Sequence, residues 1–230
     1  MSEILHSSAY IGVFISLFSY FIGAMLQKRF RSALLNPILI ATALTICCLL
    51  LMKMDYQTYY ASARWISFLL TPATVCLAIP LYEQLEALKK NYAAILTGIL
   101  CGVLTSLCCI FLLALLFRMG KAEYVTVLPK SITTAIGMPL AESLGGYGSI
   151  AAAVIIMTGI AGNIGAEGFL KLVRITHPVA KGVAIGTASH AVGTARAMKL
   201  GETEGAISSL SIAVAGLLTV ALIPVFVNLI

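Results

Sequence analysis

The sequence predicts an all-α membrane protein with about six transmembrane helices and two re-entrant or broken-helix segments. Hydrophobic residues make up 60% of the 230-residue chain and charged residues only 10%, whereas an ordinary soluble domain is about a quarter charged. The mean hydropathy is +1.01. The apolar residues gather in runs of about 20, the length that crosses a hydrocarbon core of about 30 Å. A water-soluble fold is therefore disfavoured.

Six apolar runs are long enough, or nearly so, to span the bilayer. The first is too long for a signal-peptide core and is expected to be retained as a span. The third is short and contains Pro72 and Pro80, and the fourth contains Gly98 and Gly102, a spacing that lets two helices approach closely. The expected spans are residues 4–26, 34–52, 65–82, 92–117, 149–172 and 206–229.

Basic residues between the spans predict the orientation, because cytoplasmic loops carry an excess of Lys and Arg. One side of the membrane receives eight of them and the other side receives four: Lys53, Arg64, Arg118 and Lys121. The richer side is expected to be cytoplasmic, which places both termini outside. Its eight residues are Lys28, Arg29, Arg31, Lys89, Lys90, Lys171, Arg174 and Lys181.

Two segments, 129–146 and 182–201, are rich in Gly, Ser, Thr and Ala and too polar to face lipid. With six spans, each segment leaves from and returns to the same side of the membrane. Non-helical backbone at membrane depth is tolerated only where protein or a watery cavity covers it. In the first segment, Pro139 is expected to break the chain, as in a hairpin.

The two polar segments resemble each other at a constant offset of 56 residues, and each precedes one long span. We therefore expect a single polytopic membrane domain over residues 1–230, with possible inverted-repeat units at 129–172 and 182–230. In secondary transporters with such repeats, the binding site forms where broken helices meet near the midplane. The identical positions are Ala135, Gly137, Ala141, Leu144 and Gly145, which coincide with Ala191, Gly193, Ala197, Leu200 and Gly201.

Composition and motifs exclude several classes of function. The net charge of +6 is spread over short clusters between apolar runs, which argues against nucleic-acid binding. The six cysteines lie inside apolar runs without the spacing of disulfides or a zinc site, and we interpret them as small buried hydrophobic residues. No nucleotide, metal or catalytic motif is present, so we expect neither an enzyme nor a cofactor.

The second polar segment carries the strongest candidates for solute binding. Its glycines allow an unwound backbone that frees amides and hydroxyls. Its histidine is a candidate proton carrier and its arginine offers a planar fork that matches a carboxylate. The alternatives are a hydrogen bond from the histidine to a neighbouring helix, and an arginine that reaches toward the headgroups. The candidate residues are Thr187, Ser189, His190, Thr194 and Arg196.

The first polar segment opens a half-helix after Pro129, whose free amides would attract an anion. The candidate binding residues there are Lys130, Ser131, Thr133 and Thr134. Lys130 either supplies a counter-charge or marks the membrane interface.

Other polar positions have structural alternatives. Asn36, beside Pro37, is a further candidate for lining a solute path, although a plain helix kink explains it equally well. Four glycines spaced three apart from Gly159 to Gly168 predict a close helix contact. On the same helix, Glu167 is expected to pair with Lys171.

Four strings closely resemble the LrgB/CidB family of membrane proteins: LLNPIL, PATVCLAIPLYEQL, LPKSITTAIGM and GTASHAVGTARA. The resemblance runs through nearly the whole chain. Many members have Thr-Pro after the paired hydroxyls, where this chain has Thr134-Ala135. Bacterial members are named holin-like or antiholin-like and modulate murein hydrolase activity and autolysis, usually beside a smaller LrgA/CidA-type partner. A plant plastid relative transports glycolate and glycerate, and some bacterial pairs are associated with pyruvate movement.

The residues together with the resemblance favour a transporter of small monocarboxylates, or its larger subunit, in the bacterial plasma membrane. The anion would bind between the two polar segments, with the hydroxyls of Thr133, Thr134, Ser189 and Thr194 as ligands. The alternative is a holin- or antiholin-like regulator that acts through oligomerisation and partner contact. The expected partners are the small LrgA/CidA-type protein, a small organic anion and a possible second copy of the chain.

Overall fold

The computed structural model describes residues 10–30, 36–69 and 85–230, with the single positions 72, 75, 76, 79 and 82. Every regular element in these ranges is an α-helix, as the composition predicts. The chain forms two compact units, Met1–Cys76 and Leu77–Ile230. The expectation of one domain over the whole chain stays a prediction.

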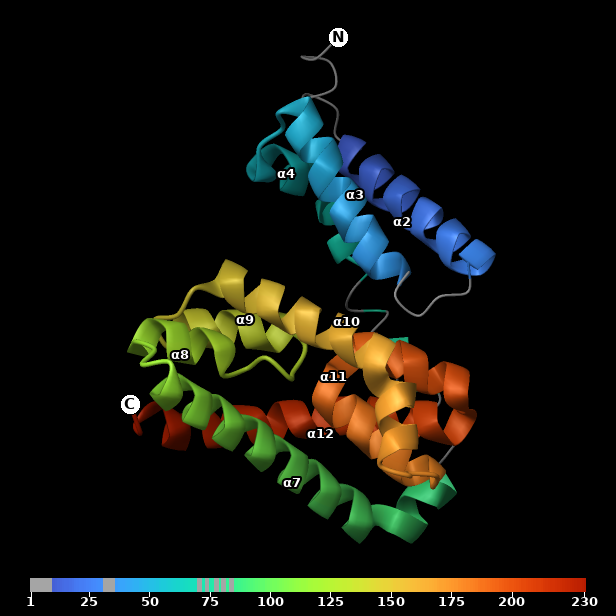
Figure 1. The fold of residues 1–230 in the computed structure, drawn as a ribbon, viewed down its shortest axis with the longest axis vertical. Helices are drawn as coiled ribbons and strands as arrows, with labels where there is room; N and C mark the ends of the chain where they lie inside the picture. The colour runs from blue at the N-terminus through green and yellow to red at the C-terminus, as the bar shows by residue number, and fades with distance from the viewer. Residues whose placement is uncertain are drawn as a thin grey trace. The chain divides into compact units, whose positions relative to one another are not determined.

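In the described part of the N-terminal unit, three helices pack together (Figure 1), with Gly12 close to Ser62 and Gly23 close to Pro37. The Gly12 amide donates to the Ser62 hydroxyl oxygen at 2.9 Å, and the Ser16 hydroxyl lies 2.7 Å from that of Tyr59. Polar side chains thus pair with one another inside the unit. The helices are α2 (Ile11–Phe30), α3 (Pro37–Met52) and α4 (Tyr56–Ser67).

Within the described residues, four helices are long and apolar enough to cross a membrane: α2, α7, α10 and α12. Helix α3 has 16 residues, about 24 Å at ~1.5 Å per residue, which is shorter than the hydrocarbon core. The expected span at 65–82 lies partly outside the described residues, and Pro80 is one of the positions outside. The part of the chain that the structure describes therefore supports an all-helical membrane protein, with four clear spans in that part.

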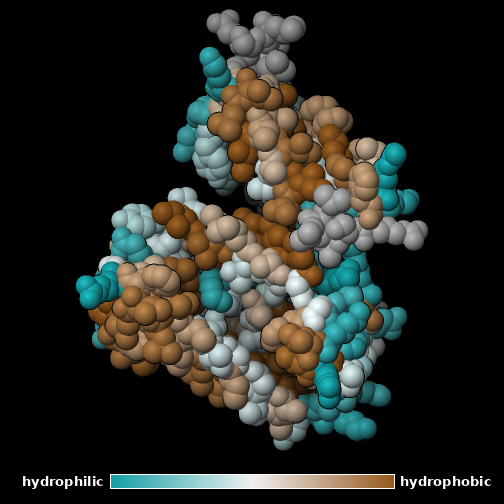
Figure 2. All heavy atoms as spheres, in the orientation of Figure 1, coloured by the Kyte–Doolittle hydropathy of each residue, from teal (hydrophilic) through white to brown (hydrophobic). Residues whose placement is uncertain are grey.

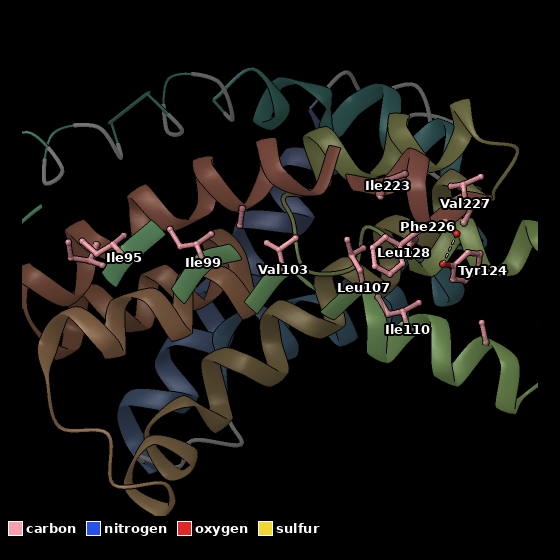
Figure 3. Packing of buried hydrophobic residues seen from close by; sticks show 14 of the residues in the cluster. Ile95, Ile99, Val103, Leu107, Ile110, Tyr124, Leu128, Ile223, Phe226 and Val227 are labelled. Atoms are coloured by element: carbon pink, nitrogen blue, oxygen red, sulfur yellow. Dashed lines mark hydrogen bonds between the residues drawn. The ribbon is translucent and has the colours of Figure 1, made fainter. Parts of the chain in front are cut away.

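The C-terminal unit packs its helices around a core between α7 and α12 (Figure 3). Tyr124 of α8 is fully buried at one end of this core, where its hydroxyl donates to the Phe226 carbonyl at 3.2 Å. The helices are α7 (Leu85–Leu116), α8 (Lys121–Val127), α9 (Thr134–Ser143), α10 (Gly148–Leu172), α11 (Pro178–Leu200) and α12 (Glu202–Val227).

The first polar segment forms a turn between two short helices. Residues 128–133 connect α8 to α9, and α9 begins at Thr134 with Thr133 as its N-cap, the half-helix that the sequence predicts. Beyond α9 the chain returns to α8, because the Tyr147 amide donates to the Thr126 hydroxyl at 2.8 Å.

The expectation that Pro139 breaks this segment is wrong, because Pro139 lies inside α9. A proline removes one helical N–H, and this ten-residue helix tolerates the loss. The reversal lies earlier, at 128–133, where the helical hydrogen bonds of α8 give way to single turns such as the Lys130 amide to the Val127 carbonyl at 3.0 Å.

The second polar segment, α11, doubles back on itself at His190. This residue has φ 42° and ψ −144°, inside what is otherwise continuous helix. The first leg (178–189) runs against α10, since Gly162 faces Ser189 and Leu170 packs with Ile185. The second leg (191–200) runs along α10 in the opposite sense.

Three contacts mark the path of the second leg. The side-chain amide of Asn163 donates to the Val192 carbonyl at 2.6 Å, and Leu170 packs with Ala197. We call the end of α11 away from His190 its open end. There, Lys181 of the first leg and Met198 of the second both lie beside the first turn of α12. Both ends of α11 therefore lie at the same end of the unit.

The surface of both units is largely hydrophobic (Figure 2). In the C-terminal unit, hydrophilic side chains gather where α7 begins and α10 ends. The expectation that the cysteines are buried is wrong for Cys47, Cys76, Cys101, Cys108 and Cys109, which are exposed. The reason is that an apolar run in a membrane protein need not enter a core, because lipid can cover it.

Close backbone packing around α11 predicts a difference between two glycines. A Cβ at Gly186 would overlap the Ser208 carbonyl oxygen of α12, whereas one at Gly165 on α10 would meet nothing within 4 Å. We expect Gly186→Ala to destabilise the protein by about 1–3 kcal/mol through overpacking. Gly165→Ala, the matched control, is expected to be neutral or to stabilise by up to about 1 kcal/mol. Thermal unfolding in one detergent measures both, and equal melting temperatures would contradict the packing of α11.

Candidate solute cavity

A cavity of about 660 Å³ lies between α7, the turn that precedes α9, and the first leg of α11. We call it the solute cavity. Its walls are mostly small side chains, and its polar groups are hydroxyls, one amide, one lysine and one histidine. The lining residues are Asn91, Ala94, Gly98, Gly102, Thr105, Ser106, Cys109, Lys130, Ser131, His177, Val179, Ala180, Val183, Ala184, Thr187 and Ala188.

A lysine and two serines form a chain of donors on one wall of the cavity. The Lys130 ammonium donates to the Ser131 hydroxyl at 3.0 Å, and the Ser131 hydroxyl lies 3.0 Å from that of Ser106. Within the part of the chain that the structure describes, no carboxylate pairs with Lys130. A lysine ammonium in mostly apolar surroundings attracts an anion.

Thr187 contributes a hydroxyl without a hydrogen bond on the facing wall. The residue is 6% exposed, and among the described residues its Oγ1 is the one buried side-chain nitrogen or oxygen that lacks a partner. A buried hydroxyl left unpaired costs about 1–3 kcal/mol. A solute or a water molecule in the cavity would supply the missing partner.

Two glycines of α7 bring this hydroxyl into place. A Cβ at Gly102 would lie 2.8 Å from the Thr187 methyl carbon, and one at Gly98 would lie 3.2 Å from Val183. The expected close helix contact at this pair of glycines is therefore confirmed, with α11 as the partner. The same contact carries the first leg of α11 to the cavity wall.

The remaining candidates of the second polar segment face away from the solute cavity. The His190 Nε2 lies 2.9 Å from the Ile155 carbonyl oxygen of α10, so this histidine ties the tip of α11 to its neighbour. Thr194 donates to or accepts from Ser208 of α12 at 2.6 Å. Ser189 lines a separate hollow of about 260 Å³ between α10 and α11. Their roles in solute binding, and the proton-carrier role of His190, stay predictions.

Arg196 does not reach the solute cavity, because its guanidinium forms an ion pair with Glu167 of α10. The expected pairing of Glu167 with Lys171 is therefore wrong. The second leg of α11 runs along α10 and brings the guanidinium into a charge-assisted hydrogen bond with the carboxylate. The pairing joins two segments 29 residues apart, which a pattern along one helix does not reveal.

Two other groups of candidates lie elsewhere. Thr133 and Thr134 begin α9 next to the cavity but are not among its lining residues. Asn36 belongs to the N-terminal unit, where its side chain caps α3 by accepting from the Ile38 amide at 2.9 Å. This capping explains Asn36 without a solute, and its role as a ligand stays a prediction.

Several lining residues escaped the sequence analysis. Thr105 and Ser106 sit inside the apolar run of α7, where isolated hydroxyls resemble ordinary helix residues. Spacing along the helix could have identified Ser106, because it follows Gly98 and Gly102 at successive four-residue steps and therefore lies on the same face. His177 and Asn91 also line the cavity, at the ends of α11 and α7.

Comparison with known proteins identifies the family. The LrgB-like family profile matches residues 16–229. Proteins named "Antiholin-like protein LrgB" from Bacillus cereus strain B4264 and from Bacillus anthracis strain CDC 684 are each 40% identical over 219 residues. The match covers 94% of this chain and 95% of each relative. No solved structure matches.

The family is not one that is named for an enzymatic activity. Both the match over nearly the whole chain and the helices long enough to span a membrane lead to one conclusion. The chain belongs to the LrgB-like family of membrane proteins.

Proposed function

We propose that this chain carries a small monocarboxylate across the bacterial plasma membrane, alone or as the larger subunit of a pair. The observation that carries the proposal is the solute cavity, which is lined by a lysine and by a buried hydroxyl that, among the described residues, have no carboxylate partner and no hydrogen bond, respectively. A carboxylate accepts from Lys130 and Ser131, while Thr187 donates to a second oxygen of the same solute. Short hydroxy- and keto-acids such as pyruvate, glycolate or glycerate offer that pattern.

The two doubled-back segments support a carrier because they would enter the membrane from opposite faces. Tyr124 of α8 lies beside the last turn of α12, through its hydrogen bond to the Phe226 carbonyl, whereas both ends of α11 lie beside the first turn of α12. Together with six spans, this is the expected arrangement of re-entrant segments around a site near the midplane. Their unwound backbone would be covered by protein and by the cavity, as the bilayer requires.

The internal repeat gains support from the positions of the helices. The offset of 56 residues carries α9 (Thr134–Ser143) onto 190–199, which is nearly the whole second leg of α11. Each of these short helices then precedes a long span, α10 or α12. An inverted repeat would let the cavity open alternately to the two sides.

The relatives are named antiholin-like, which favours a second function. That function is the regulation of murein hydrolase activity and autolysis that the family resemblance implies. These names support it more directly than transport, since no comparison names a transported solute. A regulator that acts through oligomers and a small LrgA/CidA-type partner does not need a solute cavity. The two functions are compatible if the regulator responds to the anion that it transports. An experiment can distinguish them.

Uptake into proteoliposomes distinguishes them. Vesicles with the purified chain, with and without the small partner, are loaded with a self-quenching dye and offered labelled pyruvate or glycolate. A carrier accumulates or exchanges the acid and retains the dye. A protein that only forms lesions releases both without preference. Transport by the partner alone would reduce this chain to an anchor.

Removal of the Thr187 hydroxyl should weaken solute binding. Thr187→Val keeps the shape but loses a hydrogen bond to a charged solute, worth about 1.5–3 kcal/mol. The KM for uptake should rise about tenfold or more. Thr187→Ser, which keeps the hydroxyl, should stay close to wild type. Thr158→Val on α10, whose hydroxyl only bonds the Val154 carbonyl at 2.9 Å, is the matched control outside the cavity.

Neutralising Lys130 should abolish selective uptake at low solute concentration. Lys130→Gln removes the cavity's lysine charge, whereas Lys121→Gln removes an exposed lysine at the start of α8. We expect the first to lower uptake strongly and the second to leave it unchanged. Equal uptake by both variants would exclude Lys130 as the anion's partner. Unchanged uptake by His190→Ala, Arg196→Ala and Thr134→Ala would limit the site to the residues that line the cavity.

A further inference from the structure

A second hollow, of about 350 Å³, lies where α10 ends and α11 begins and ends. We call it the basic hollow. It is separate from the solute cavity and shares no lining residue with it. Residues from α10, from the turn that follows it and from both legs of α11 meet there: Glu167, Leu170, Lys171, Arg174, Ile175, Thr176, Lys181 and Leu200.

The lining carries three cations and one carboxylate. The carboxylate of Glu167 is already paired with Arg196, and the Lys181 ammonium lies 3.7 Å from the Glu204 carboxylate. Across the described ranges, Lys171 and Arg174 have no carboxylate partner. Two exposed cations therefore face the hollow with their charge uncompensated.

The end of α10 holds these two cations on one turn. The Arg174 amide donates to the Lys171 carbonyl at 3.2 Å, and the Ile175 amide donates to the Leu170 carbonyl at 2.9 Å. Arg174 adopts the left-handed conformation, with φ 57°, that ends helices through such bonds. The turn thus fixes the backbone of Lys171 and Arg174 beside the open end of α11.

The hollow is also lined by apolar side chains. Leu170 is buried, and Ile175 and Leu200 are partly buried. Next to them, Phe169 is 62% exposed and Leu172 is 79% exposed. In a membrane protein, side chains of this kind are covered by lipid. A cationic rim beside a lipid-facing apolar wall matches a ligand with an anionic head and a hydrocarbon tail.

We propose that the basic hollow binds the phosphate group of an anionic phospholipid such as phosphatidylglycerol. Lys171 and Arg174 donate charge-assisted hydrogen bonds to the phosphate oxygens, and the glycerol and acyl chains lie along Leu170, Ile175 and the exposed residues of α10. Basic pockets between helices on the cytoplasmic side recognise lipid headgroups in this way. The eight-to-four excess of basic residues places this end of the unit in the cytoplasm.

The bound lipid would also contact three segments that already pack together around Leu170, Ile185 and Ala197. The end of α10 and both legs of α11 contribute to the hollow. A ligand that binds only the folded state stabilises it, so the lipid is expected to hold the open end of α11 closed. This role is independent of solute transport.

The competing explanation is a diffuse attraction between anionic lipid and any cytoplasmic lysine. Lys199 provides the matched control, because it is exposed on the second leg of α11, one residue from Leu200, but does not line the hollow. Lys171→Gln and Lys199→Gln change the charge by the same amount at the same end of the unit.

The experiment measures phosphatidylglycerol binding to the purified full chain in neutral detergent, by native mass spectrometry and by the rise in melting temperature. One basic residue near a membrane surface contributes about 1 kcal/mol, so Lys171→Gln should weaken binding about fivefold. Lys171→Gln combined with Arg174→Gln should weaken it about thirtyfold. Lys199→Gln should change it less than twofold. Equal losses for Lys171→Gln and Lys199→Gln would overturn the proposal.

Inorganic phosphate distinguishes the source of the phosphate group. A lipid site predicts that phosphatidylglycerol raises the melting temperature and that inorganic phosphate at millimolar concentration does not. Stabilisation by inorganic phosphate that Lys171→Gln removes would assign the same hollow to a soluble phosphate. No stabilisation by either ligand would overturn the site.

Discussion

The structure of the C-terminal unit depends on close approach of backbones around α11. A chain that reverses inside a membrane leaves amides and carbonyls that neither lipid nor water satisfies. Here, glycines at three helix contacts let the backbones approach closely, so that protein covers the reversal. Gly102 of α7 and Gly162 of α10 face α11, and Gly186 of α11 itself faces α12. His190 then closes the tip with its hydrogen bond to the Ile155 carbonyl.

This packing also creates the solute cavity. The first leg of α11 is held against α7 by glycine contacts, and the turn before α9 brings Lys130 and Ser131 to the same space. The result is one cation and several hydroxyls in a largely apolar setting, with Thr187 lacking a hydrogen bond. Burying polar and charged groups in a membrane domain costs free energy, and such groups generally mark the path or site of a solute. The ion pairs of Arg196 and Lys181 lie at the far, open end of α11 and hold its legs to α10 and α12.

Much of the fold could be predicted from the sequence because its strongest signals are local. Runs of apolar residues gave the long helices, and the Gly- and hydroxyl-rich composition of 182–201 marked the segment that doubles back at His190. The close contact of Gly98 and Gly102 was also predictable from their spacing. The prediction of a chain break at Pro139 was wrong, because a proline inside a short helix has the same sequence signature as one in a turn.

The site was less predictable, because it depends on which helices become neighbours. Ser106 and Thr187 are far apart in the sequence and meet only through the packing of α7 with α11. Arg196 carried the chemistry of a carboxylate ligand, yet Glu167 takes that role inside the protein. Asn36 likewise satisfies a helix end. Residue type alone does not reveal whether a polar group already has a partner.

The reversal of α11 is tested most directly by labelling from the two sides of the membrane. In a chain whose six cysteines are replaced by alanine, single variants His177→Cys and Lys199→Cys mark the two exposed ends of α11, and Lys121→Cys marks the start of α8. We expect an impermeant maleimide to label His177→Cys and Lys199→Cys from the same side and Lys121→Cys from the other. Labelling of Lys199→Cys from the side of Lys121→Cys would show that α11 crosses the membrane, and would contradict the account.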